Sequence, residues 1–132
     1  MLQKDFDAWN ESKKHINMMR VDFSRVIFKE REIWWCYLGI NLGHEQDGKG
    51  NRFMRPVLIL KKFSKESFIG IPLTGHLANL KYVIACQCED SIVRYVIISQ
   101  IRFFDAKRLY KSLATAEYSS FREVRKAVRD LL

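Results

Sequence analysis

Residues 32–38 read Glu-Ile-Trp-Trp-Cys-Tyr-Leu, and their side chains alternate between the two faces of an extended chain. A period of two is typical of a β-strand. Ile33, Trp35 and Tyr37 would face one side, and the residues between them the other side. Because both faces are apolar, we expect this strand to be central, or to be covered by a helix or a second subunit.

Four further apolar runs of strand length follow this one along the chain. They are residues 56–60, 67–73, 82–88 and 94–99. Short strands at such regular spacing predict a small barrel or a curled sheet.

Helices are predicted before and after these strands in the sequence. Residues 4–20 place apolar side chains, including Phe6 and Trp9, at helical spacing, and we expect this helix to dock on the domain. Near the C-terminus, Ser120 and Glu123 have the spacing of a capping box that starts a helix. The 132 residues are therefore predicted to form one mainly β domain with helices (β+α).

The chain is basic, with 23 Lys and Arg against 15 Asp and Glu and a net charge of +8. The excess is spread along the chain, so the positive field belongs to the body of the fold. Such a charge favours polyanionic partners, either nucleic acid or an acidic protein segment. No apolar run is long enough to span a membrane, and the N-terminus does not resemble a secretory signal, so we expect a cytoplasmic location.

Neither a disulfide framework nor a metal site is predicted. Cys36, Cys86 and Cys88 form neither an even set nor a C-x-x-C pair, and Cys86 and Cys88 are expected to be small core residues. The carboxylates are scattered along the chain, without a spacing that suits a metal ion. We therefore expect the protein to work without a metal or another cofactor.

Residues 39–54 form a long connection that contains four of the chain's six glycines. A connection of this length without a helix or strand pattern is usually functional or disordered. Within it, residues 43–49 fit the pattern G-x-x-x-x-G-K. However, Gly50 stands where a phosphate-binding loop needs Ser or Thr, and no helix pattern follows. Binding of a nucleoside triphosphate is therefore not predicted.

Side chains suited to phosphate chemistry lie in this connection and directly after two of the strands. They are His44, Glu45, Arg52 and Arg55, then Thr74 and His76, then Ser99, Gln100 and Arg102. If the barrel brings these strand ends together, the pocket could bind a phosphodiester, stabilise its added charge and move a proton. Taken singly, each has a plainer role: Glu45 as a solvated charge, Thr74 in a turn, or Arg102 paired with Asp105.

Taken in order, these segments resemble the PemK/MazF family, the toxins of type II toxin–antitoxin modules. The matching segments are residues 32–35, 43–46, 55–60, 71–74 and 99–102, followed by Asp105 and residues 108–109. The resemblance runs from about residue 29 to residue 132. Residues 1–24 are similar to an N-terminal helical extension of one PemK-like branch, which leaves the toxin domain at residues 25–132.

The resemblance implies a compact SH3-like barrel with a C-terminal helix, assembled as a homodimer. It also implies a metal-independent endoribonuclease that cuts single-stranded RNA, mainly mRNA, at short sequences. Attack by the substrate's own 2′-hydroxyl would leave a 2′,3′-cyclic phosphate and a 5′-hydroxyl. An antitoxin is expected to inhibit the enzyme by laying an acidic, disordered segment across the RNA groove.

The resemblance matches Glu45, Arg55, Thr74, Gln100 and Arg102 to family residues, and the chemistry of phosphodiester cleavage gives the site residues their expected roles. Arg55 is expected to stabilise the phosphorane, Thr74 to add a hydroxyl donor, and Glu45 or His76 to act as the base. The expected substrate contacts are His44, Gln46, Arg52, Phe53, Ser99, Gln100 and Arg102. One branch of the family has Asp and Arg where this chain has Ser99 and Ile97. Proton transfer is therefore expected from other groups, with His44 and Arg55 as further candidates.

Two functions of other classes compete with the ribonuclease. One is a non-catalytic SH3-like module that binds RNA or an antitoxin without cutting. The other is a topoisomerase poison of the same fold, a class that works through apolar and aromatic residues at the end of its C-terminal helix. This chain ends in Arg-Asp-Leu-Leu at residues 129–132, without a tryptophan, which disfavours the poison.

Overall fold

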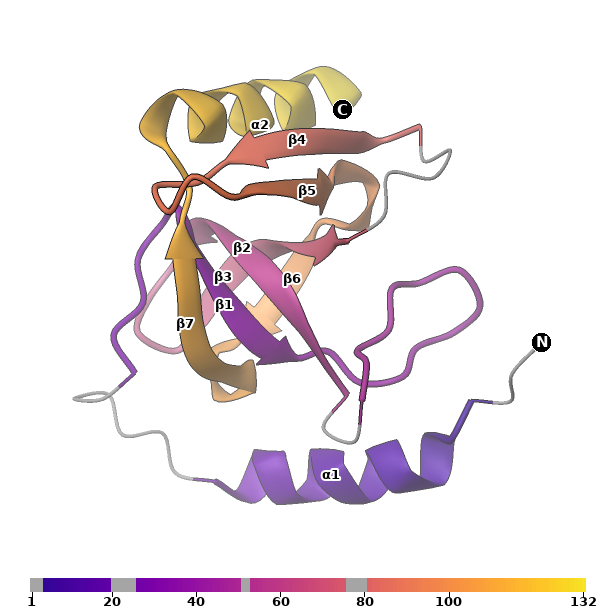
Figure 1. Cartoon of the computed structure of the whole chain (residues 1–132). Coiled ribbons are helices and arrows are strands. Elements are labelled where there is room, and N and C mark those ends of the chain that lie inside the picture. The colour runs from indigo at the N-terminus through magenta and orange to yellow at the C-terminus, as the bar shows by residue number, and fades with distance from the viewer. Residues whose placement is uncertain (1–3, 20–25, 51–52, 76–80) are drawn as a thin grey trace.

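The computed structural model describes residues 4–19, 26–50, 53–75 and 81–132. Two α-helices and seven β-strands lie within these residues (Figure 1). They are α1 (Phe6–Met18), β1 (Glu32–Tyr37), β2 (Met54–Lys62), β3 (Ser67–Thr74), β4 (Val83–Gln87), β5 (Val93–Ile97), β6 (Arg102–Asp105), β7 (Leu109–Thr115) and α2 (Tyr118–Leu131). Short 3₁₀ turns, η1 (Ile98–Gln100) and η2 (Ala106–Arg108), precede β6 and β7.

The strands pair antiparallel in the order β4-β5-β3-β2-β1-β7, and β6 pairs with β3 beside that path. The sheet curls, with α2 lying over β4 and β5 and α1 at the opposite end of the molecule (Figure 1). The prediction of a mainly β chain with a helix towards each end is confirmed. β1 lies between β2 and β7, so its expected central position is confirmed as well.

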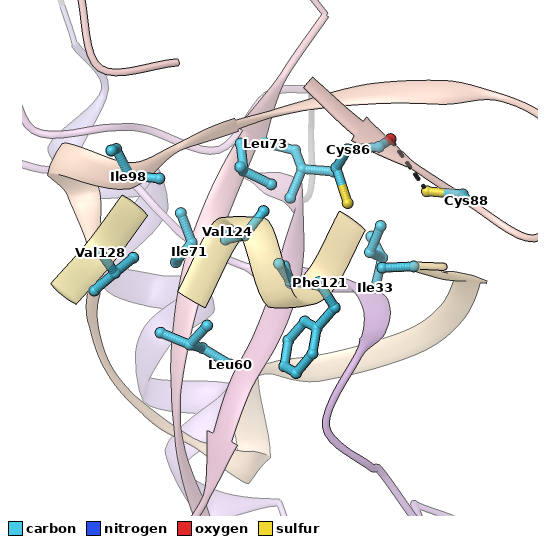
Figure 2. Packing of buried hydrophobic residues seen from close by; sticks show 13 residues of the cluster. Ile33, Leu60, Ile71, Leu73, Cys86, Cys88, Ile98, Phe121, Val124 and Val128 are labelled. Carbon is cyan, nitrogen blue, oxygen red and sulfur yellow. Dashed lines mark hydrogen bonds between the residues drawn. The ribbon is translucent and has the colours of Figure 1, made fainter. Parts of the chain in front are cut away.

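Buried apolar side chains form two clusters, one on each face of β1. The first cluster lies between the sheet and α2 and contains Ile33, Phe121 and Val124 (Figure 2). The second cluster contains Trp34 and Cys36. The chain therefore buries Ile33, Trp34 and Cys36, whereas Trp35 and Tyr37, on the same face as Ile33, stay partly exposed.

The start of α2 differs from the predicted capping box. The helix begins one turn earlier in the chain, Glu117 is its N-cap residue, and no side chain caps it. Ser120 lies inside the first turn and is buried, and its Oγ accepts a hydrogen bond from the backbone N–H of Gln87 at 2.9 Å. The hydroxyl therefore ties α2 to β4, and the capping-box prediction was wrong because Ser120 faces the sheet.

Helix α1 starts at an N-cap, Asp5, whose side chain accepts a hydrogen bond from the N–H of Ala8 at 3.0 Å. The helix docks on the domain through Trp9 and Ile16, which are buried. Phe6, expected to share this docking face, is 45% exposed. Among the described residues, no helix combines the length and the apolar character needed to cross a bilayer.

Candidate functional site

Arg55 lies at the start of β2, opposite Cys36 of β1, and is only 7% exposed. Its Nε donates to the backbone oxygen of Asp47 at 2.7 Å, and its Nη1 donates to the backbone oxygen of Leu73 at 3.0 Å. Burial lowers the pKa of the guanidinium, and the carboxylate of Asp47 acts in the opposite direction. Arginine remains charged under these conditions. The site therefore holds a buried cation in one orientation.

Thr74, at the end of β3, lies beside Arg55 in a surface depression of about 550 Å³. Trp35, Arg94 and Tyr95 also line this depression. Arg94 is paired with Asp90 through two hydrogen bonds of 3.0 and 2.9 Å, and Lys49 also lines the depression, whereas Arg55 is held there by backbone oxygens. A phosphate could meet a guanidinium and a hydroxyl here.

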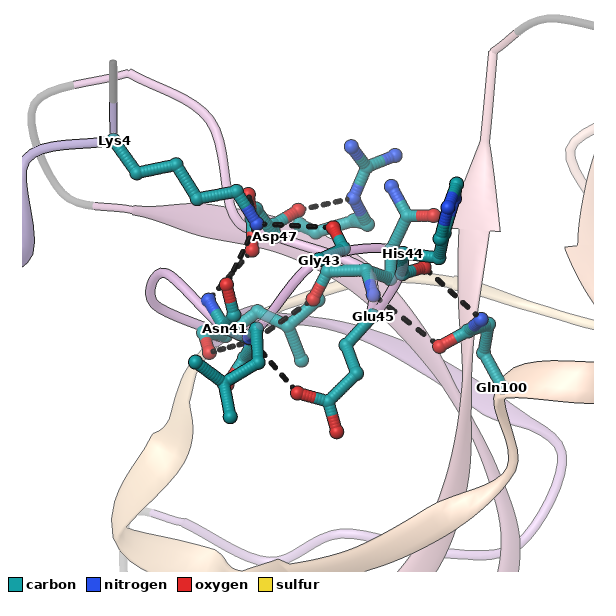
Figure 3. Close-up of polar contacts among 11 residues, drawn as sticks. Lys4, Asn41, Gly43, His44, Glu45, Asp47 and Gln100 are labelled. Atoms are coloured by element: carbon teal, nitrogen blue, oxygen red, sulfur yellow. Dashed lines mark hydrogen bonds and ion pairs between the residues drawn. The ribbon is translucent and has the colours of Figure 1, made fainter.

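The connection between β1 and β2 is folded by its own polar contacts (Figure 3). Asp47 Oδ1 accepts from the N–H of Asn41 at 2.6 Å, and the amide of Asn41 donates to the backbone oxygen of Gln46 at 2.9 Å. Glu45 Oε1 accepts from the N–H of Leu42 at 2.9 Å. These contacts give the loop a defined conformation, in which the backbone oxygen of Asp47 accepts from Arg55.

Gln100 joins this loop to the end of β5. Its amide oxygen accepts from the N–H of Gln46 at 3.2 Å, and its amide nitrogen donates to the backbone oxygen of His44 at 3.4 Å (Figure 3). With its amide oxygen turned towards the guanidinium, Gln46 accepts from Arg55 Nη2 at 2.6 Å. The residues after β5 therefore contact the first loop at His44 and Gln46, and Gln46 in turn contacts Arg55.

A second depression, of about 520 Å³, lies on the Gln46 side of this junction. It is lined by five of the predicted residues: Glu45, Gln46, Ser99, Gln100 and Arg102. The guanidinium of Arg102 lies over the ring of Phe104, 4.8 Å from its centroid. Burial lowers the pKa of Arg102, while the Glu45 carboxylate acts in the opposite direction. The alternative pairing of Arg102 with Asp105 is absent from the ion pairs of the described residues.

Two predicted residues are placed differently from the expectation, and two are not placed. Phe53, predicted as a substrate contact, is half-buried, with its ring edge-on to that of Trp9 at a centroid distance of 5.6 Å. His44 is exposed and contributes its backbone oxygen to Gln100. Arg52 and His76 lie outside the described residues.

Arg108, in η2, is a cation that the sequence analysis matched to the family pattern without giving it a role in the site. Its Nη1 donates to the backbone oxygen of Tyr37 at 2.9 Å, and its guanidinium lies 5.9 Å from the ring centroid of Trp9. Burial lowers the pKa of Arg108, and the positive charge of Arg102 lowers it further. Arg102 lines the second depression, whereas Arg108 lies beside α1, and the two positive charges are close enough to affect each other. No spacing in the sequence signals this, because the partners of Arg108 are backbone oxygens and an aromatic ring.

A comparison with protein-family models finds one match over most of the chain. The model described as a PemK-like, MazF-like toxin of type II toxin–antitoxin systems matches residues 29–132. The chain belongs to this family. The resemblance seen in the sequence is thereby confirmed, and the site around Arg55 lies in the part of the chain that carries the family pattern. No curated protein has a sequence that matches this chain.

Solved structures share the fold of this PemK/MazF-family chain at low sequence identity. Form I of MazF from Deinococcus radiodurans aligns with a TM-score of 0.64 at 20% identity, over 80% of this chain and 96% of that one. An endoribonuclease in complex with its cognate antitoxin, from a mycobacterial species, aligns with a TM-score of 0.57 at 15% identity, over 79% and 93%. Form II of MazE–MazF from D. radiodurans aligns with a TM-score of 0.57 at 17% identity, over 80% of this chain and 93% of that chain.

Proposed function

We propose that this protein is the toxin of a type II toxin–antitoxin module and that it acts as an endoribonuclease on single-stranded RNA, mRNA above all. The observation that carries the proposal is the buried guanidinium of Arg55, held at a depression that Thr74 also lines. Membership of the toxin family and the likeness to a mycobacterial endoribonuclease support it. Residues 25–132 form the toxin domain in this proposal, and residues 1–24 an extension.

In the proposed mechanism, the 2′-hydroxyl of the RNA attacks the adjacent phosphorus. The nucleophile and the phosphorus belong to one molecule, so little positioning entropy is lost in this step. The guanidinium of Arg55 and the hydroxyl of Thr74 donate to the non-bridging oxygens as charge builds on them. A base takes the 2′-proton, and an acid protonates the departing 5′-oxygen. The products are a 2′,3′-cyclic phosphate and a 5′-hydroxyl.

Glu45 or His76 serves as the base in this proposal. Glu45 precedes Gln46, whose amide contacts Arg55, and Glu45 lines the neighbouring depression beside Arg102. Its Oε1 holds the N–H of Leu42, so the carboxylate is already oriented by the loop. Gln46, Ser99, Gln100 and Arg102 would bind the RNA strand along the second depression.

The proposed partners are a second copy of the chain and an antitoxin with an acidic segment. The net charge of +8, and the positive charges of Arg102 and Arg108, which lie close enough to affect each other, suit an acidic peptide as well as RNA. Two of the similar solved structures are complexes of a toxin-family protein with its antitoxin. A monomer mass in light scattering would refute the dimer, and simultaneous binding of antitoxin and uncleavable RNA would refute competition for one groove.

Cleavage of a long single-stranded RNA in the presence of EDTA tests the proposed activity. We expect the wild-type protein to cut, and Arg55→Lys and Arg55→Ala to lose on the order of 10²–10³ in rate, as for other preorganised charge-stabilising donors. Arg122→Ala, which removes an exposed arginine from α2, is the matched control and should cut normally.

The same assay with a 2′-deoxy nucleotide at the cut site tests the nucleophile without changing the protein. This RNA should bind but resist cleavage, and the wild-type products from ordinary RNA should carry a cyclic phosphate. Normal cleavage of the deoxy substrate, or loss of activity in EDTA, would refute the mechanism. Binding without any cleavage would instead favour the non-catalytic module.

A further inference from the structure

We infer that α1 and the residue before its cap position the loop of the proposed site, with Lys4 and Trp9 as the two positioning residues. The inference concerns residues outside the match to the toxin family, which begins at residue 29. Its effect on catalysis rests on the proposed function, whereas its effect on the loop can be measured in the absence of any activity.

Trp9 closes the neck of the β1–β2 loop. The loop begins at Gly39 and ends at Phe53, and the N–H groups of Leu38 and Gly39 both donate to the backbone oxygen of Phe53, at 2.9 and 3.0 Å. The indole of Trp9 lies against Gly39 and edge-on to the ring of Phe53. One buried side chain of α1 therefore contacts both ends of the loop.

The contact with Gly39 leaves no room for another residue at that position. Gly39 has a φ of +79°, a backbone conformation that glycine adopts readily. A β-carbon there would also overlap the indole ring of Trp9. The start of the loop thus fits the side chain of Trp9 closely, because only glycine leaves room for the indole at this position.

Lys4 holds the middle of the same loop (Figure 3). Its Nζ lies 3.0 Å from Oδ2 of Asp47 and donates to the backbone oxygens of Asn41 and Gly43, at 2.6 and 3.2 Å. The Lys4 and Asp47 side chains are each 28% exposed. Three oxygens of one loop therefore converge on a single ammonium group that comes from the N-terminal segment.

Asp47 connects Lys4 to the proposed catalytic residue. The carboxylate of Asp47 receives Lys4 and the N–H of Asn41, while its backbone oxygen receives Nε of Arg55. If Asp47 moves, the oxygen that accepts from the Arg55 guanidinium moves with it. Displacements of about 1 Å at a catalytic group can cost about a hundredfold in rate, so a loop held in advance favours turnover.

The far end of α1 is also attached to the domain. Lys107 Nζ donates to the backbone oxygen of Asn17 at 3.0 Å, and the guanidinium of Arg108 lies over Trp9. Arg108 in turn donates to the backbone oxygen of Tyr37, at the end of β1. The helix thus lies across the loop with contacts at both of its ends.

Amide hydrogen exchange of the full chain tests the positioning directly. We expect Lys4→Met and Trp9→Ala to speed exchange at residues 41–48 by about tenfold, while Lys4→Arg and Trp9→Phe stay near the wild type. Lys14→Met is the matched control, because Lys14 lies on the same helix and, among the described residues, forms an ion pair with Glu11 and not with the loop. Unchanged exchange in both Lys4→Met and Trp9→Ala would overturn the inference.

Kinetics of RNA cleavage then tests whether the positioning serves catalysis. Lys4→Met should lower kcat about tenfold with KM within about twofold, because the RNA contacts remain while the alignment of Arg55 is lost. Lys4→Arg should restore kcat. Faster loop exchange with an unchanged kcat would overturn the catalytic part. If the wild-type protein does not cut RNA, the proposed function fails, and the exchange data alone decide whether α1 holds the loop.

Discussion

At the scale of single residues, the three cysteines occupy apolar surroundings. Cys36, Cys86 and Cys88 are all buried and unpaired. Burial raises the pKa of the Cys86 thiol to about 11, although a hydrogen bond with Ser120 acts in the opposite direction. Burial also raises the pKa of Cys36 strongly, although Arg108 and Arg102 act in the opposite direction. The Cys36 and Cys86 thiols are therefore protonated at neutral pH, and Cys86 and Cys88 are core side chains as their alternation predicted.

These shifts predict a loss of stability in alkali. A thiol whose pKa is higher in the folded state stabilises the fold fully below its unfolded pKa, near 9, and loses that contribution as the pH rises. We expect the free energy of unfolding to fall between about pH 9 and 11, by up to about 1.4 kcal/mol per pH unit for each such thiol. Urea titrations along the pH scale measure this loss. Cys86→Ala should show a smaller slope than the wild type, and equal slopes would contradict the assignment.

At the scale of elements, the attachment of α2 depends on a polar contact as well as on its apolar stripe. The N–H of Glu117 donates to the backbone oxygen of Gln87, and the N–H of Gln87 donates to Ser120 Oγ. Phe121, Val124 and Val128 then follow into the first apolar cluster. Polar contacts at the start of α2 thus fix its register against β4, and its apolar side chains pack further along the helix.

Ser120→Ala should therefore destabilise the protein by about 1–3 kcal/mol, because it leaves a half-buried backbone N–H without its acceptor. Ser119→Ala removes the same hydroxyl from an exposed neighbour and should change the free energy of unfolding by less than about 0.5 kcal/mol. Urea denaturation of the two variants compares them directly. Equal stabilities would show that the Ser120 contact contributes nothing.

The sequence predicted β1 to β5 because each has an apolar run long enough to mark it. It did not predict β6 or β7. β6 has only four residues, and residues 110–112 of β7 are all exposed, so neither carries an apolar alternation. These strands exist because β3 and β1 offer them unpaired edges, which is a property of the assembled sheet.

The candidate site was predictable in its members and not in its geometry. Arg55, Gln46 and Gln100 were identified from their motifs. That Leu73 would supply an acceptor to Arg55 depends on the register between β2 and β3, which no local pattern encodes. The role of Trp9 was likewise hidden, since a buried tryptophan on an amphipathic helix is explained by docking alone.

At the scale of the whole molecule, three partly buried arginines line three separate depressions of the surface. Arg55, Arg102 and Arg108 come from β2, β6 and η2, and the charge of Arg102 is felt by Arg108. Among the described residues, none of these three arginines forms an ion pair with a carboxylate. Guanidinium groups held in this way are suited to phosphates of a single strand.

RNA affinity should therefore fall steeply with salt. If the three arginines each neutralise one phosphate, log K should change with log salt by about −2, which is about a 20-fold loss between about 50 and 200 mM. Fluorescence anisotropy with an uncleavable RNA measures this slope. Arg102→Ala should reduce it by about 0.7, whereas Arg122→Ala on α2 should leave it unchanged. A slope near zero would rule out an electrostatic groove.

The pairing of β1 with β7 has a consequence for how the protein is made. A ribosome releases β1 early and β7 near the end, at about 5–20 residues per second, so β1 waits several seconds for one of its two neighbours. η2, which carries Arg108 beneath Trp9, also emerges late. The nascent chain therefore lacks the complete sheet that carries the proposed site until most of it has been translated. A protein that attacks messages would thus stay harmless to its own message until the last strand is released.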